Sequence, residues 1–174
     1  LPQSERFKTS NIITLALIPG PNEPKLHQLN HYLASIINQF MELWEGIDLS
    51  STYESSTAAI ICCACDIPAA RKLYGHISTR IACHRCKKRA NIENNFKTNF
   101  GGFTDIDQWF VPRDVEEIKN NTSLWKECNT EDARKKHISK NLVCWSEMHR
   151  LPYFNSAQFL IIDPMHCLFL EIAK

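Results

Sequence analysis

Hydrophobic residues gather in three runs, a near-continuous one at residues 11–18 and continuous ones at residues 58–65 and 159–162, each closed by proline or aspartate. Short apolar runs with such boundaries predict buried strands. Residues 22–46 instead carry leucine, isoleucine and aromatic residues at intervals of three and four. This spacing predicts a long amphipathic helix with Asn22 as its cap and Gly46 at its end. The order strand, helix, strand predicts an α/β sheet with parallel neighbours.

The rest of the sequence predicts a further helix, an irregular segment and a division of the chain into three parts. A further helix is predicted over residues 68–73, directly after the second apolar run. Periodicity then fails over residues 81–150, although helices are predicted near residues 114–126 and 131–139. We therefore predict three parts: residues 1–80 as a core of strand, helix and strand, residues 81–150 as an irregular insertion, and residues 151–174 as a return to the core.

Composition limits the classes of function. Of the 174 residues, 44% are hydrophobic, which predicts a folded protein, and a formal net charge of +1 predicts that any contact with nucleic acid is local. The sequence has no signal-peptide pattern after Leu1 and no run long enough to span a bilayer, so we expect a soluble and truncated protein. Eight cysteines without such a signal favour a reducing compartment, with Cys62, Cys63 and Cys65 as small core residues.

Two aspartates, Asp66 and Asp163, each end an apolar run and precede a helical pattern with an early proline. The carboxyl ends of parallel strands are where α/β sheets place catalytic groups, so Asp66 could hold a divalent cation there. The other interpretation is a helix cap, which the local sequence alone favours for both residues. His166 follows Asp163 by three residues, in the first predicted turn of the helix.

The pair Cys83 and Cys86 has the two-residue gap that lets two thiolates reach one tetrahedral Zn²⁺. A CxxC pair is half a site, so the alternatives are an unliganded pair or a redox pair. Downstream residues would have to complete a zinc site. The candidates are His166, His149, Cys144, His137 and Cys128.

Basic residues form two clusters, at Lys87, Lys88 and Arg89 and at residues 134–136. Each cluster could contact phosphates, although a solvated surface is the more common role. The aromatic residues of segment 81–150 could stack on bases, but core packing is the commoner explanation.

Five segments, taken together, carry a resemblance to a known family. They are Arg6-Phe7-Lys8 with Asn11-Ile12-Ile13, the turn at residues 17–25, residues 65–72, the pair Cys83 and Cys86, and residues 162–166. In this order and spacing they resemble the Tnp2-type transposases of CACTA elements over nearly the whole chain. The resemblance is greatest to copies spread through fungal genomes.

The resemblance implies a partial RNase H-like domain, a mixed sheet with flanking helices, in which two Asp and one Glu bind two Mg²⁺ or Mn²⁺ ions and cut and join DNA at transposon ends in the nucleus. Asp66 matches the second catalytic carboxylate, with the first Asp expected before Leu1 and the Glu after Lys174. Cys83 and Cys86 match the family's CxxC, and Asp163 with His166 match its DxxH. His166 is therefore the preferred third zinc ligand, and Asp163 is either catalytic or structural.

The sequence also departs from the family pattern. Cys167 and Glu171 stand where the family usually has Asn and Gly, which indicates a decayed or partial copy. The resemblance thus implies a transposase fragment that is inactive as an isolated chain. One alternative is a zinc-stabilised module for DNA binding or protein interaction. Another is a thiol redox protein that uses Cys83 and Cys86.

Overall fold

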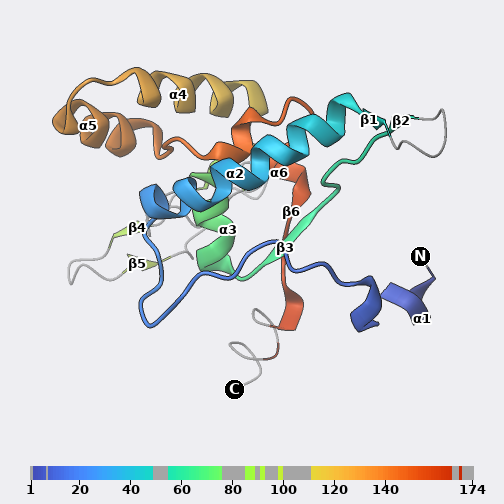
Figure 1. Cartoon of the computed structure of the whole chain (residues 1–174). Coiled ribbons are helices and arrows are strands. Elements are labelled where there is room, and N and C mark those ends of the chain that lie inside the picture. Colours follow the sequence, from blue (N-terminus) through green and yellow to red (C-terminus); the bar gives the residue numbers. More distant parts are fainter. Residues whose placement is uncertain are drawn as a thin grey trace.

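The chain has a mixed α/β structure in which helices surround a short pair of parallel strands (Figure 1). The computed structural model describes residues 2–6, 8–48, 55–75, 85–88, 91–92, 98–99, 111–165 and 169. Its helical elements are α1 (Gln3–Arg6), η1 (Thr9–Asn11), α2 (Leu26–Glu45), α3 (Ile67–Tyr74), α4 (Val115–Glu127), α5 (Glu131–Asn141), η2 (Glu147–Arg150) and α6 (Ser156–Phe159). Its strands are β1 (Ile47–Asp48), β2 (Ser55–Ser56), β3 (Cys63–Cys65), β4 (Asn91–Ile92), β5 (Thr98–Asn99) and β6 (Leu160–Ile162).

The central sheet pairs β3 with β6 in parallel, although 94 residues separate Cys65 from Leu160 in the numbering. Cys63 lies opposite Leu160 and Cys65 opposite Ile162. The expectation of an α/β structure with parallel strands is confirmed, but the strands that pair are the second and third apolar runs and not the first and second. The other two sheets of the described residues, β1–β2 and β4–β5, are antiparallel pairs.

The helices begin and end at local signals in the sequence. The long helix predicted from residue 22 begins later, at Leu26, because Lys25 is the capping residue and its N–H donates to Oε1 of Gln28 at 2.9 Å. It ends as predicted at Gly46, whose φ of +104° few other residues adopt. Helices α3, α4 and α5 are confirmed within a few residues of their predicted bounds.

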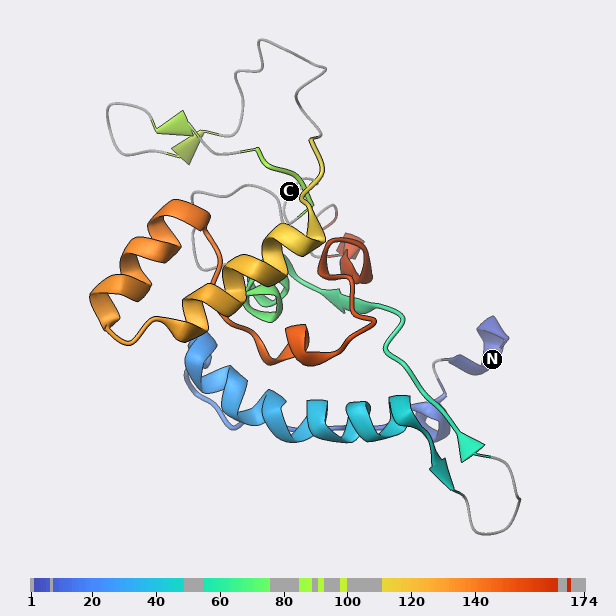
Figure 2. The same ribbon diagram turned by 90° about the horizontal axis from the view of Figure 1, so that it is seen from above.

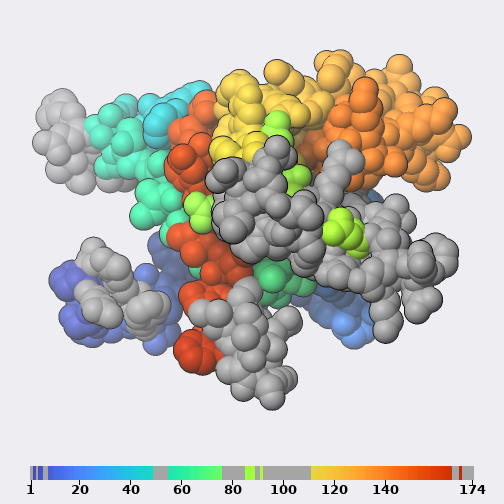
Figure 3. Space-filling view, turned by 180° about the vertical axis from the view of Figure 1, so that it is seen from behind, coloured from blue at the N-terminus to red at the C-terminus, as the bar shows by residue number. Residues whose placement is uncertain are grey.

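Two groups of buried side chains form the core. One contains Ile37 of α2 with Met148, Leu151 and Phe154. The other contains Ala70, Tyr74, Ile118 and Leu160, so α3, α4 and β6 pack together. Seen from above, α2 runs along the outside of η2 (Figure 2), and from behind, α4 and α5 form the upper rim of the molecule (Figure 3). Residues 118–151 therefore contribute directly to the core that the flanking segments form.

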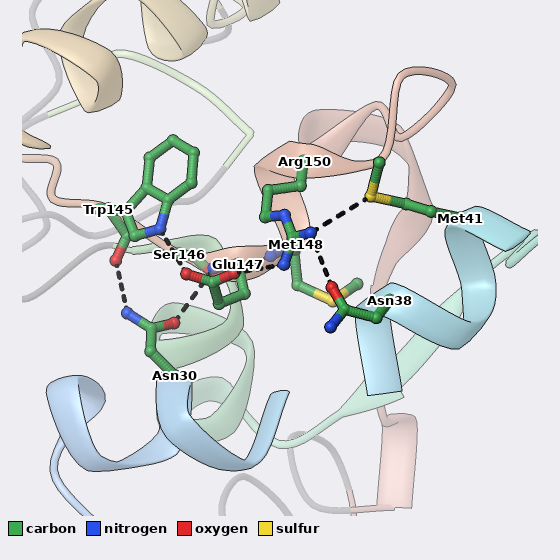
Figure 4. A network of polar contacts seen from close by, with 8 residues as sticks. All are labelled: Asn30, Asn38, Met41, Trp145, Ser146, Glu147, Met148 and Arg150. Atoms are coloured by element: carbon green, nitrogen blue, oxygen red, sulfur yellow. Dashed lines mark hydrogen bonds and ion pairs between the residues drawn. The ribbon is translucent and has the colours of Figure 1, made fainter. Parts of the chain in front are cut away.

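Polar contacts fasten α2 to the segment around η2 (Figure 4). The side chain of Asn30 donates to the carbonyl of Trp145 at 3.0 Å and accepts from the N–H of Glu147 at 3.1 Å. Two turns further along α2, Oδ1 of Asn38 accepts from Arg150 at 2.7 Å. Both asparagines thus lie on the face of α2 that the 145–150 segment covers.

The prediction of a buried strand at residues 11–18 is wrong. Residues 12–20 have neither helix nor strand, and Ile13 and Leu17 are 81% and 87% exposed. An apolar run forms a buried strand only when another strand pairs with its backbone, and none of the described residues does so here. The second run is strand only over β3, and Ile61 before it is 80% exposed. None of the helices in the described part of the chain is long and apolar enough to cross a membrane.

Candidate functional site

Asp66 stands between β3 and α3 and caps the helix. Its Oδ1 accepts a hydrogen bond from the N–H of Ala69 at 2.7 Å, and Pro68 occupies the first turn, where a missing N–H costs nothing. The helix-cap interpretation of Asp66 is therefore confirmed. Its second carboxylate oxygen has no hydrogen-bond partner among the described residues, so capping leaves one oxygen available.

Asp163 repeats this arrangement after β6. Its Oδ1 accepts from the N–H of Met165 at 2.9 Å, which starts a helical turn at Pro164. Its own N–H donates to the carbonyl of Cys65 at 2.8 Å and extends the ladder between the two strands by one bond. The cap interpretation holds for Asp163 as well.

The parallel register places Asp66 and Asp163 side by side. Because Cys65 lies opposite Ile162, the next residue of each strand is an aspartate at the same edge of the sheet. Neighbouring strands are about 4.8 Å apart, so the two carboxylates start from adjacent backbone positions. Carboxylate oxygens are the donors that Mg²⁺ and Mn²⁺ prefer, so this edge suits a hard divalent cation. The described residues contain no group of three His, Cys, Asp or Glu side chains that could complete such a site.

The thiols beside this edge are poor metal ligands and nucleophiles. Burial, followed by the charges of Cys65 and Cys62, raises the pKa of the Cys63 thiol to about 11. Burial, followed by the charge of Asp66, also raises the pKa of Cys65. Both thiols stay protonated at neutral pH, and only thiolates bind metal well. Cys63 and Cys65 are half-buried and pack against the core, whereas the prediction that Cys62 is a core residue is wrong because its side chain is exposed.

The predicted zinc ligands fall partly outside the described residues, as Cys83 and His166 do. Cys86 is buried and forms an isolated antiparallel bridge with Pro112. The other downstream candidates have local hydrogen bonds: Cys128 with Leu124, His137 with Asn141, Cys144 with Gly75 and His149 with Tyr74. Among the described residues, no cluster brings these side chains together.

The basic cluster at residues 87–89 is partly described. Lys87 is exposed and its Nζ lies 2.7 Å from Oε2 of Glu117 on α4. Lys88 is half-buried, and Arg89 lies outside the described residues. An exposed ion pair contributes at most about 1 kcal/mol, so a DNA phosphate could compete with Glu117 for Lys87.

A cavity opens between α2, α3 and α4, and no pattern in the sequence indicated it. Its volume is about 570 Å³, and two tryptophans, Trp125 and Trp145, line it together with Lys25, Arg71 and Lys72. The lining comes from four distant segments of the chain, so no local motif marks it. The aromatic residues noted in segment 81–150 include Trp125 and Trp145 and were a partial signal, whereas neither basic cluster noted in the sequence lines the cavity.

The chain matches a protein-family model. The model described as "Transposase family tnp2" matches residues 1–123 of the 174. No curated protein and no solved structure matches the chain.

Proposed function

The chain belongs to the tnp2 family of transposases, and we propose that it is an internal part of the catalytic domain of a CACTA-type cut-and-paste transposase with an RNase H-like core. Its partner is then DNA at transposon ends, and its place of action is the nucleus. The resemblance of residues 65–72 and 162–166 to Tnp2-type transposases supports the same assignment.

One observation carries the proposed chemistry: the register that sets Asp66 and Asp163 next to each other at the carboxyl edge of β3 and β6. In this proposal Asp66 binds a divalent cation through the oxygen that the helix cap does not use. The hydrogen bond from Ala69 holds the carboxylate in one rotamer, which lowers the entropy lost on binding. Asp163 adds negative charge at the same edge.

Divalent cations at such a site would activate a water or a 3′-hydroxyl and stabilise the leaving oxygen during in-line attack on a phosphodiester. The family's other two acids, an Asp expected before Leu1 and a Glu expected after Lys174, would supply the ligands that Asp66 cannot. Two aspartates at one edge of the sheet provide too few ligands for two cations. The isolated chain is therefore proposed to be inactive in cleavage and strand transfer.

Asn and Asp cap helices equally well, so Asp66→Asn separates the two roles of this residue. We expect Asp66→Asn to keep the stability of the chain, while Asp66→Ala loses about 1 kcal/mol. Mn²⁺ titrations followed by water proton relaxation should show saturable binding to the parent chain that both variants lose. Asp48→Asn, at an exposed position in β1, is the matched control and should bind Mn²⁺ like the parent.

Unchanged Mn²⁺ binding in Asp66→Asn would refute the role of Asp66 as a metal ligand. The same preparations should leave supercoiled plasmid DNA intact in Mg²⁺. Nicking by the parent chain that disappears in Asp66→Ala would contradict the proposed inactivity and show that the chain contains a complete site.

A structural Zn²⁺ held by Cys83, Cys86 and His166 belongs to the same proposal. Such an ion would stabilise the segment that contains the CxxC pair. Zinc measured by elemental analysis should approach one ion per chain and fall sharply in Cys86→Ser. A zinc-free parent chain that stays folded would refute it.

A further inference from the structure

The cavity between α2, α3 and α4 combines flat aromatic walls with positive charge. Trp125 and Trp145 line it, and so do Lys25, Arg71 and Lys72. Among the described residues no Asp or Glu lines it, although Glu23 forms an ion pair with Lys72 close by. A volume of about 570 Å³ lies within the range of sites that hold small molecules. The chemistry therefore favours a planar ligand that carries negative charge.

Further cations flank the two tryptophans. Nζ of Lys126 lies 4.0 Å from the centre of the Trp145 ring, and the guanidinium of Arg134 lies 4.9 Å from that of Trp125. These cations add positive potential around the cavity without filling it, since neither residue lines it. The indole N–H of Trp125 is buried and has no acceptor among the described residues.

The cavity lies next to the proposed catalytic edge. Pro68 lines it, two residues after Asp66, and so does Arg71 on the next turn of the same helix. A rise of about 1.5 Å per residue sets Arg71 roughly 6 Å along α3 from Ile67, a distance that one or two nucleotides of a DNA strand can span. A strand whose phosphate lies at Asp66 and Asp163 can therefore reach the cavity with a nearby nucleotide.

We infer that this cavity binds one unpaired nucleotide of the DNA strand, with the base stacked on Trp145 and its phosphate next to Lys25 and Arg71, an inference that rests on the proposed function. A base inside a duplex is stacked on both sides and cannot enter. The ligand is thus a nucleotide that is flipped out, bulged or single-stranded.

The test compares three fluorescein-labelled probes of one sequence on the full chain: a 20-base-pair duplex, the same duplex with one bulged thymine, and the single strand. Stacking on an aromatic side chain contributes about 1–3 kcal/mol per base, so the bulged and single-stranded probes should bind roughly 5- to 160-fold more tightly than the duplex. Trp145→Ala should remove this preference, and Trp145→Phe should keep most of it.

Trp44→Ala is the matched control. Trp44 is 44% exposed, and the centre of its ring lies 4.4 Å from that of Tyr153. It does not line the cavity. The Trp44→Ala variant should keep the preference for unpaired DNA. Lys25→Gln removes an exposed cation and should lower the slope of log affinity against log salt by about 0.7 for the single strand.

The outcomes distinguish this inference from the function on which it rests. Equal affinity for the three probes, or a preference that survives in Trp145→Ala, refutes nucleotide binding in the cavity and leaves DNA as the partner. Failure of the parent chain to bind any probe refutes DNA as a partner of this chain and, with it, both proposals.

Discussion

Gly75, at the end of α3, lies against the backbone of Cys144. A Cβ at Gly75 would overlap the carbonyl oxygen of Cys144, and the φ of Gly75 is +74°. In turn, the N–H and the thiol of Cys144 both donate to the carbonyl of Gly75, at 2.7 and 2.9 Å. Ser146 donates to the carbonyl of Leu73 at 2.6 Å. Residues 144–146 thus supply the hydrogen bonds that the last carbonyls of α3 lack within the helix.

This contact predicts a large effect for Gly75→Ala. The left-handed backbone costs an L-residue about 1–2 kcal/mol, and the overlap with Cys144 adds to this, so we expect a loss of at least about 2 kcal/mol in the free energy of unfolding. Urea unfolding followed by circular dichroism measures it. Gly20→Ala is the control, because no atom lies within 4 Å of its added Cβ, and it should change stability by less than about 0.5 kcal/mol. Equal losses in the two variants would contradict the packing described for Gly75.

The two asparagines of α2 predict different losses. Asn30→Ala removes two hydrogen bonds and leaves the carbonyl of Trp145 and the N–H of Glu147 without that partner, which should cost about 1–3 kcal/mol. Asn38→Ala removes one exposed contact with Arg150, which keeps its ion pair with Glu147, and should cost about 0.5 kcal/mol or less. Thermal unfolding of both variants gives the order. A larger loss for Asn38→Ala would contradict the assignment of Asn30 as the main polar contact.

His149 makes the stability depend on pH in mildly acid solution. Burial lowers its pKa below the ordinary 6.5, and the charge of Lys119 lowers it further, against the opposing effect of the bond to the Tyr74 carbonyl. The unfolded chain then binds the proton first as pH falls. The stability that neutral His149 provides is complete above pH 6.5 and is lost as pH falls from there to the folded pKa.

His149→Gln keeps a side-chain N–H for the Tyr74 carbonyl but does not titrate. We expect the urea midpoint to fall less between pH 7.5 and pH 5.5 in this variant than in the parent, while the exposed His31→Gln follows the parent. The same fall in all three proteins would show that other groups cause the acid effect.

The helix boundaries that the sequence predicted well depend on local capping residues. Asp66 and Pro68 define the start of α3, Thr130 caps α5, and both bounds needed no knowledge of distant residues. The alternation of apolar runs and helices indicated parallel strands, but it did not indicate that β3 pairs with β6. A sequence does not show which strand pairs with a given apolar run. Residues 11–18 are therefore predicted as a buried strand, whereas in the structure they are exposed.

Other features depend on long-range contacts or on unusual local geometry. Leu142 ends α5 with a φ of +65°, a conformation that leucine rarely adopts and that no sequence pattern marks. The cavity joins Trp125 and Trp145 with Lys25 and Arg71, and these residues meet only when α2, α3 and α4 are packed. The pair Asp66 and Asp163 is an intermediate case. The sequence marks each aspartate as the end of an apolar run, but only the register of β3 and β6 shows that the two residues are adjacent.

The exposure of the cysteines predicts an order of reaction with iodoacetamide. Cys62 is exposed, whereas burial raises the pKa of Cys63 to about 11 and also raises that of Cys144, which is fully buried. Alkylation requires the thiolate and access to it, so at pH 8 Cys62 should react at least about tenfold faster than Cys63 or Cys144. Peptide mass spectrometry after timed quenching gives the three rates. In guanidinium chloride the three rates should converge, because unfolding removes burial, and equal rates in the native protein would contradict the packing around Cys144 and Cys63.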